Sequence, residues 1–131
     1  MEIKGRIWDE ENKHMSDWYD IRNHGLYMWN ENERQGFGIT MLWTGLEDTN
    51  HKEIYDGDIV LAQAKYLSHQ RYLVVWDKAR CGFYLKPLGS ERANYDKYYR
   101  MNVCKLTVVG DMYQNPELLT KEYVKKMGGL Q

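Results

Sequence analysis

Short stretches in which apolar and polar side chains alternate recur roughly every ten residues along the chain, and each predicts a strand. The clearest is 37–43, where Met41 and Trp43 fall on one face and Leu42 on the other. Further strands are predicted at 3–8, 15–19, 54–55, 59–64, 72–76, 82–86 and 103–109. Many short strands at this spacing are typical of a small barrel or sandwich, so the pattern predicts an all-β fold.

Three regions depart from this alternation. Residues 20–36 are polar and interrupted by glycines, which predicts a long loop carrying one short strand at 26–29. Residues 94–100 carry tyrosines at the spacing of a helical turn. At 115–117 an asparagine, a proline and a glutamate form a typical helix start, and apolar positions then recur every four residues up to Met127. The sequence therefore predicts a short C-terminal helix.

Two polar turns lie close together in the middle of the chain. The first begins at Asp48, and the second contains Gly57, which can adopt a positive φ. We interpret Asp48 and Asp56 as turn formers whose carboxylates accept hydrogen bonds from nearby backbone amides, and Asp58 as structural too. The acidic cluster that they form with His51 matches neither an EF-hand nor a zincin spacing, so no metal site is expected.

The composition is sufficient for one packed interior. Of 131 residues, 43% are hydrophobic and 14% are aromatic. Eight side chains on the predicted strands are expected to form the core: Trp43, Ile54, Ile59, Val74, Trp76, Phe83, Leu106 and Val108.

The net charge and the length of the apolar runs argue against two classes, non-specific duplex-binding proteins and membrane proteins. With 18 basic and 19 acidic residues the net charge is -1, so the excess of positive charge that favours non-specific duplex binding is missing. No apolar run is long enough to cross a bilayer, and the N-terminus carries no apolar signal core. We therefore expect a soluble cytoplasmic protein with no membrane role. Cys81 and Cys104 fit no zinc spacing and are expected to be reduced thiols.

The sequence contains no nucleophile elbow, phosphate-binding glycine loop or paired acid–base motif. The expectation is a protein that is not an enzyme and needs no cofactor.

Aromatic residues are the more informative excess, with five tryptophans and eleven tyrosines. Tyrosine and tryptophan are enriched at binding hot spots. A candidate interaction surface consists of aromatic residues from the loop-rich N-terminal region and from the tyrosine-rich segment at 94–100: Trp18, Tyr19, Tyr27, Trp29, Tyr95, Tyr98 and Tyr99. The alternative is that these rings cover the ends of a small barrel.

Two kinds of partner remain open. The nearly balanced charge favours a protein, either a host factor or a second copy in a homo-oligomer. A single-stranded nucleic acid is the alternative, held by aromatic stacking and by a local basic edge. That edge would consist of Arg71, Lys78, Arg80, Lys97 and Arg100.

Four segments, at 3–9, 43–60, 75–84 and 109–119, are similar in content, order and spacing to the YopX family of bacteriophage and prophage proteins. The most specific elements are Thr-Gly-Leu at 44–46, Tyr-Asp-Gly-Asp-Ile at 55–59 and Asn-Pro-Glu-Leu at 115–118.

The resemblance implies an SH3-type barrel at 45–113, with an N-terminal β region at 1–44. The helix or tail at 114–131 extends past the family's usual ending and is predicted from the sequence pattern alone. The resemblance also implies a phage or prophage accessory protein but no reaction, since the family's role is not established. His51 stands where relatives carry a glycine, so the usual left-handed turn is not expected there.

Overall fold

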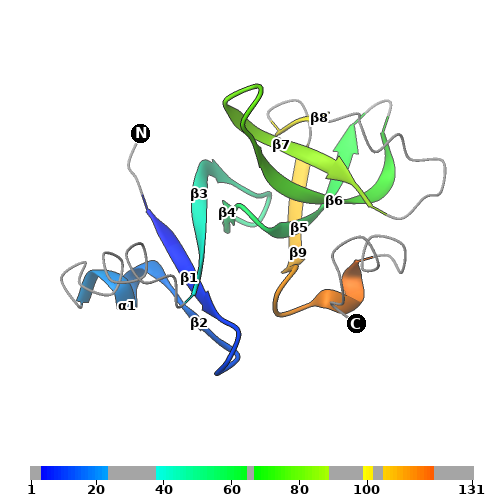
Figure 1. The fold of residues 1–131 in the computed structure, drawn as a ribbon. Coiled ribbons are helices and arrows are strands. Elements are labelled where there is room, and N and C mark those ends of the chain that lie inside the picture. Colours follow the sequence, from blue (N-terminus) through cyan, green and yellow to red (C-terminus); the bar gives the residue numbers. More distant parts are fainter. Residues whose placement is uncertain (1–3, 24–37, 65–66, 89–98, 102–104, 120–131) are drawn as a thin grey trace.

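The computed structural model describes residues 4–23, 38–64, 67–88, 99–101 and 105–119 (Figure 1). Within these ranges, strands predominate and form two antiparallel sheets, which confirms the all-β fold. The first sheet has the order β2–β1–β3–β4, with β1 Gly5–Asp9, β2 His14–Ser16, β3 Ile39–Glu47 and β4 Glu53–Tyr55. The second has the order β8–β7–β6–β5–β9, with β5 Asp58–Ala64, β6 Leu67–Asp77, β7 Gly82–Pro87, β8 Tyr99–Arg100 and β9 Lys105–Asp111.

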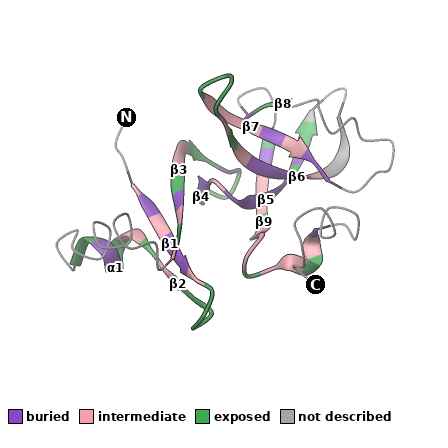
Figure 2. Ribbon diagram, viewed as in Figure 1, coloured by how far each residue is buried: buried purple, intermediate pink, exposed green. Residues whose placement is uncertain are grey.

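The second sheet is covered on both faces. Because successive side chains of a strand point to opposite faces, strands β5 and β6 each contribute to two apolar clusters. The larger cluster contains Ile54, Val60, Ala62, Tyr72, Val74, Leu85, Met101 and Leu106. The smaller, on the other face, contains Ile59, Leu73, Leu88 and Leu119. Figure 2 shows this burial concentrated in β4, β5, β6 and β7.

A helix, α1 Trp18–Asn23, stands where the end of a strand and the start of a loop were predicted. Asp17 starts it, since its carboxylate accepts the amide of Asp20 at 2.9 Å. Ile21 is fully buried and anchors the helix. The strand predicted at 15–19 is therefore restricted to β2, and the short strand predicted at 26–29 lies outside the described residues.

The C-terminal helix prediction is wrong for the residues that the structure describes. Pro116–Leu118 form a single 3₁₀ turn, and the backbone of Leu119 is extended. Asn115 does not cap this turn; its side-chain oxygen instead accepts the amide of Asp111 at 3.1 Å, at the end of β9. Residues 120–131 lie outside the described ranges. Tyr99, predicted in a helical turn, lies in strand β8.

One predicted core residue is misplaced. Ile54, Ile59, Val74 and Leu106 are buried, and Trp43, Phe83 and Val108 are partly buried, but the Trp76 side chain is 47% exposed. Trp76 lies on the inward face of β6, one residue before the strand ends, where little covers that face. Its ring packs edge-on against its cross-strand partner Phe83, with centroids 5.0 Å apart.

These positions predict unequal costs of truncation. Leu85→Ala should lower the free energy of unfolding by about 2–4 kcal/mol, because a fully buried side chain leaves a cavity. Trp76→Ala should lower it by about 1 kcal/mol, mainly through the lost ring pair. Urea unfolding followed by circular dichroism measures both. Equal losses for the two variants would contradict the placement of Trp76.

Candidate functional site

The turn between β4 and β5 connects three parts of the molecule. Gly57 has φ +90° there, its amide donates to the carbonyl of Val74 at 2.8 Å, and its carbonyl accepts the amide of Met112 at 2.9 Å. A Cβ at this position would lie 2.9 Å from the Met41 Cε. The positive φ therefore favours glycine, and a Cβ would in addition displace the flexible end of the Met41 side chain.

Asp58 connects the two sheets at this turn. Its carboxylate is 1% exposed, accepts the Tyr55 amide at 2.8 Å, and pairs with the Arg6 guanidinium from β1. The same guanidinium lies 4.5 Å from the centre of the Tyr55 ring. Burial raises the pKa of Asp58 to about 6, although the Arg6 charge and the Tyr55 amide oppose this.

Asp56 does not have the role predicted for it. Within the described part of the chain its carboxylate accepts no backbone amide, and Asp58 forms the turn hydrogen bond instead. The reason is position, since Asp58 can reach back three residues to the Tyr55 amide while its other oxygen meets Arg6. Burial, together with repulsion from Asp58, raises the pKa of Asp56 to about 6.

Asp48 connects the β3–β4 turn to β9. Its Oδ1 accepts the amides of Asn50 and Lys52, both at 2.8 Å, and its Oδ2 accepts the amide of Val108 at 2.9 Å. Burial alone would raise the pKa of Asp48, but these three hydrogen bonds hold it below its usual value. Both carboxylate oxygens of Asp48 therefore accept backbone hydrogen bonds, and the residue has a structural role.

The backbone at position 51 of the same turn is left-handed, although the residue is not a glycine. His51 has φ 64°, contrary to the expectation from its side chain. A hydrogen bond of 3.0 Å from its amide to the carbonyl of Asp48 holds this conformation, which ordinarily favours glycine.

Strand β3 contains an irregularity that turns a leucine outward. The register with β4 shifts between Trp43 and Glu47, and Gly45 has φ +89°. The Leu46 amide donates to the Thr44 hydroxyl at 3.2 Å, and the Leu46 carbonyl accepts the Trp43 indole N–H at 3.1 Å. The outcome is a backbone-anchored leucine whose side chain is 38% exposed. We call residues 44–46 the β3 bulge.

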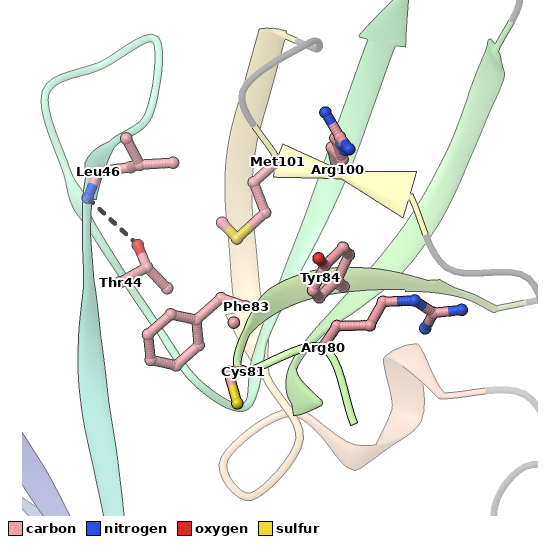
Figure 3. A pocket seen from close by; sticks show the side chains of 9 residues that line it. Thr44, Leu46, Arg80, Cys81, Phe83, Tyr84, Arg100 and Met101 are labelled. Atoms are coloured by element: carbon pink, nitrogen blue, oxygen red, sulfur yellow. Dashed lines mark hydrogen bonds between the residues drawn. The ribbon is translucent and has the colours of Figure 1, made fainter. Parts of the chain in front are cut away.

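Two hollows adjoin this bulge, between β3 and the β7–β8–β9 side of the second sheet, and both are lined by Leu46 and Met101. We call the two hollows together the groove. The first, of about 360 Å³, is lined by Thr44, Leu46, Arg80, Cys81, Gly82, Phe83, Tyr84, Arg100 and Met101. The second, of about 310 Å³, is lined by Leu46, Glu47, Asp48, Thr49, Ile54, Met101, Lys105 and Leu106. Figure 3 shows Leu46 pointing across the first hollow toward Met101.

The aromatic residues predicted as an interaction surface do not gather into one patch where they are described. Tyr19 is 71% exposed on α1, and Trp18 beside it is partly buried. Tyr99 packs edge-on against the buried Tyr72, with centroids 5.7 Å apart. The remaining members of that set, Tyr27, Trp29, Tyr95 and Tyr98, lie outside the described residues.

Sequence reasoning missed Leu46 and Trp76 as surface residues. A signal for Leu46 was present, because a glycine inside a strand pattern indicates a bulge. Cys81 is an exposed thiol at the groove, whereas Cys104 is outside the described ranges. Among the described residues, no group of three or more His, Cys, Asp or Glu side chains could hold a metal ion. None of the described helices has the length and apolar character to span a membrane.

The two packed antiparallel sheets place the chain in the all-β class, and comparison with known proteins supplies a family. A family model described as YopX protein matches residues 4–120, so the chain belongs to the YopX family. The crystal structure of protein EF1440 from Enterococcus faecalis is similar in fold, with a TM-score of 0.57 and 23% identity over 92% of this chain and 99% of that chain. No curated protein matches the sequence.

The raised pKa of Asp56 predicts a pH-dependent stability. In the unfolded chain this carboxyl ionises near pH 3.8, whereas in the folded protein its pKa is about 6. Below pH 3.8 the Asp56 carboxyl is protonated in both states and does not lower the free energy of unfolding. As the pH rises from 3.8 to about 6, the carboxyl ionises more readily in the unfolded chain, and the free energy of unfolding falls. Asp56→Asn should raise the free energy of unfolding by roughly 1–2 kcal/mol at pH 7.5 and by almost nothing at pH 3.5.

Thermal unfolding at both pH values measures the effect. Glu11→Gln serves as the control, because Glu11 is exposed and lies away from this turn. A difference between Asp56→Asn and the native protein that is the same at both pH values would contradict the prediction.

Proposed function

We propose that the protein is a non-enzymatic protein-binding module, encoded as an accessory protein by a phage or prophage, and that the groove is its binding surface. The observation that carries the proposal is the apolar rim of the groove. Leu46 is 38% exposed there, and the 47% exposed Trp76 packs on the groove residue Phe83. Exposed apolar side chains that surround a hollow are typical of interaction sites.

The carboxylates near the groove and the turns support a non-enzymatic role. Both oxygens of Asp48 and both oxygens of Asp58 are engaged in hydrogen bonds that hold the fold together. The high pKa of Asp56 arises from burial between the sheets and from Asp58, not from a position in the groove.

An SH3-type barrel at 45–113 is part of the proposal. The last strand of the second sheet, β9, returns to pair with its first, β5, while β5 to β8 follow one another. That order is the one expected of such a barrel, and SH3-like domains commonly bind peptides in aromatic-lined grooves. The likeness is one of fold and does not name a ligand.

The partner in this proposal is either a host protein in the bacterial cytoplasm or a second copy of the chain. Self-association needs no second gene product, since a self-complementary patch is sufficient.

Single-stranded nucleic acid is the second candidate, and one observation favours it. Arg80 and Arg100, both members of the basic edge identified in the sequence, line the same hollow as Phe83 and Tyr84. A strand that stacks on aromatic rings between arginines would use this combination.

Affinity capture from prophage-bearing cells, with and without nuclease, tests the proposal alongside light scattering of the purified protein. We expect a protein partner that survives nuclease treatment, or a dimeric mass at micromolar concentration. Trp76→Ala should reduce either association at least fivefold, whereas Tyr19→Ala, which removes an exposed ring on α1, should leave it unchanged. A monomer whose captured material disappears with nuclease would contradict protein binding and favour the nucleic-acid alternative.

A further inference from the structure

We infer that the groove binds an extended acidic segment of a partner protein, with one apolar side chain of that segment inserted between Leu46 and Met101. This inference rests on the proposed protein-binding function and adds the chemistry of the partner. Its starting point is the β3 bulge, the Thr-Gly-Leu element of the sequence that the fold itself leaves partly exposed.

The bulge is built to hold Leu46 at the groove. The Thr44 hydroxyl donates to the Ile54 carbonyl at 2.8 Å and accepts the Leu46 amide at 3.2 Å, which fixes the bulge to β4. The Trp43 indole fixes the other side through the Leu46 carbonyl. An apolar side chain held in a fixed position at the surface loses little further freedom when it binds, which favours association.

The walls of the groove suit an aliphatic or aromatic side chain of a peptide. Leu46 and Met101 line both hollows, and Ile54 and Leu106 line the second. Nucleobases bind chiefly by stacking on flat aromatic faces. Phe83 already packs against Trp76, and Tyr84 lies under Arg80, whose guanidinium is 5.5 Å from the ring centre. The aliphatic lining therefore favours a peptide over a nucleic acid.

The charges around the groove favour an acidic segment. Arg100 and Lys105 are exposed at its edge, and neither has an ion-pair partner within the described residues. Arg80 is paired with Asp77 at 2.5 Å and so adds little net charge. On the opposite wall Glu47 lies 3.6 Å from His51. The side formed by Arg100 and Lys105 is therefore locally positive, although the whole chain has a net charge of -1.

Electrostatic complementarity of this kind contributes more to the choice of partner than to the strength of binding. A segment with carboxylates on either side of one leucine would place the leucine on the apolar walls and the carboxylates near Arg100 and Lys105.

A titration with defined peptides tests the inference. The probe is the peptide Gly-Ser-Asp-Asp-Leu-Glu-Asp-Ser-Gly, compared with a version carrying alanine for leucine, a version carrying asparagine and glutamine for the acids, and the oligonucleotide dT12. Amide shifts of the ¹⁵N-labelled protein report binding. We expect the largest shifts at residues 44–46, 82–84 and 100–101, and at least fivefold weaker binding for either altered peptide.

Variants then locate the site. Leu46→Ser and Arg100→Glu should each weaken peptide binding at least fivefold. Leu61→Ser removes an exposed leucine of β5 from the other face of the sheet, and Arg22→Glu reverses an exposed charge on α1, so both should bind the peptide normally. Shifts outside the groove, binding unaffected by Leu46→Ser, or preferential binding of dT12 would each overturn the inference.

The same variants separate this inference from the proposed function. If a nuclease-resistant partner is captured equally by the native protein, Leu46→Ser and Arg100→Glu, the protein is a binding module but this account of its groove is wrong. If neither a partner nor a dimer is found, the proposed function itself fails.

Discussion

A buried ion pair between Arg6 in β1 and Asp58 at the start of β5 joins the N-terminal strands to the second sheet. Asp58 also closes the adjacent turn through the Tyr55 amide, so one carboxylate sets both a local bend and the contact between the sheets. Trp8 of β1 adds an apolar contact nearby, stacking on Tyr113 with centroids 6.3 Å apart. Burial disfavours the ionised form of Asp58 and Arg6 favours it, so the cost of burying the two charges offsets part of their attraction.

The groove lies beside a closure of the core, and Asp48 and Thr49 belong to both. Asp48 and Thr49 bond the β3–β4 turn to β9, since the Asp48 carboxylate accepts the Val108 amide and the Thr49 amide donates to the Leu106 carbonyl. Just before this turn the register of β3 with β4 shifts around Gly45, which has a positive φ, and β3 pairs with β1 and β4 and not with β7 or β8. The groove lined by Leu46 and Met101 follows from these two facts, and the proposed binding role follows from the groove.

Most strands were predictable from the sequence, because alternation in stretches such as 72–76 and 82–86 directly reflects a sheet with two faces. Alternation does not show whether a face is covered at the end of a strand, which is why Trp76 was assigned to the core. Nor does it reveal partners far along the chain. Asp58 finds Arg6 at a separation of 52 residues, so its role could not be separated from that of Asp56. The groove was unpredictable for the same reason, since its walls come from segments distant in sequence.

A double-mutant cycle measures how strongly Arg6 and Asp58 depend on each other. Free energies of unfolding at pH 7.5 would be compared for the native protein, Arg6→Met, Asp58→Asn and the double variant. If the pair holds the sheets together, each single change leaves its partner buried without an opposite charge. The loss of unfolding free energy in the double variant should then be smaller than the sum of the two single losses by about 2 kcal/mol. Strictly additive losses would contradict the account.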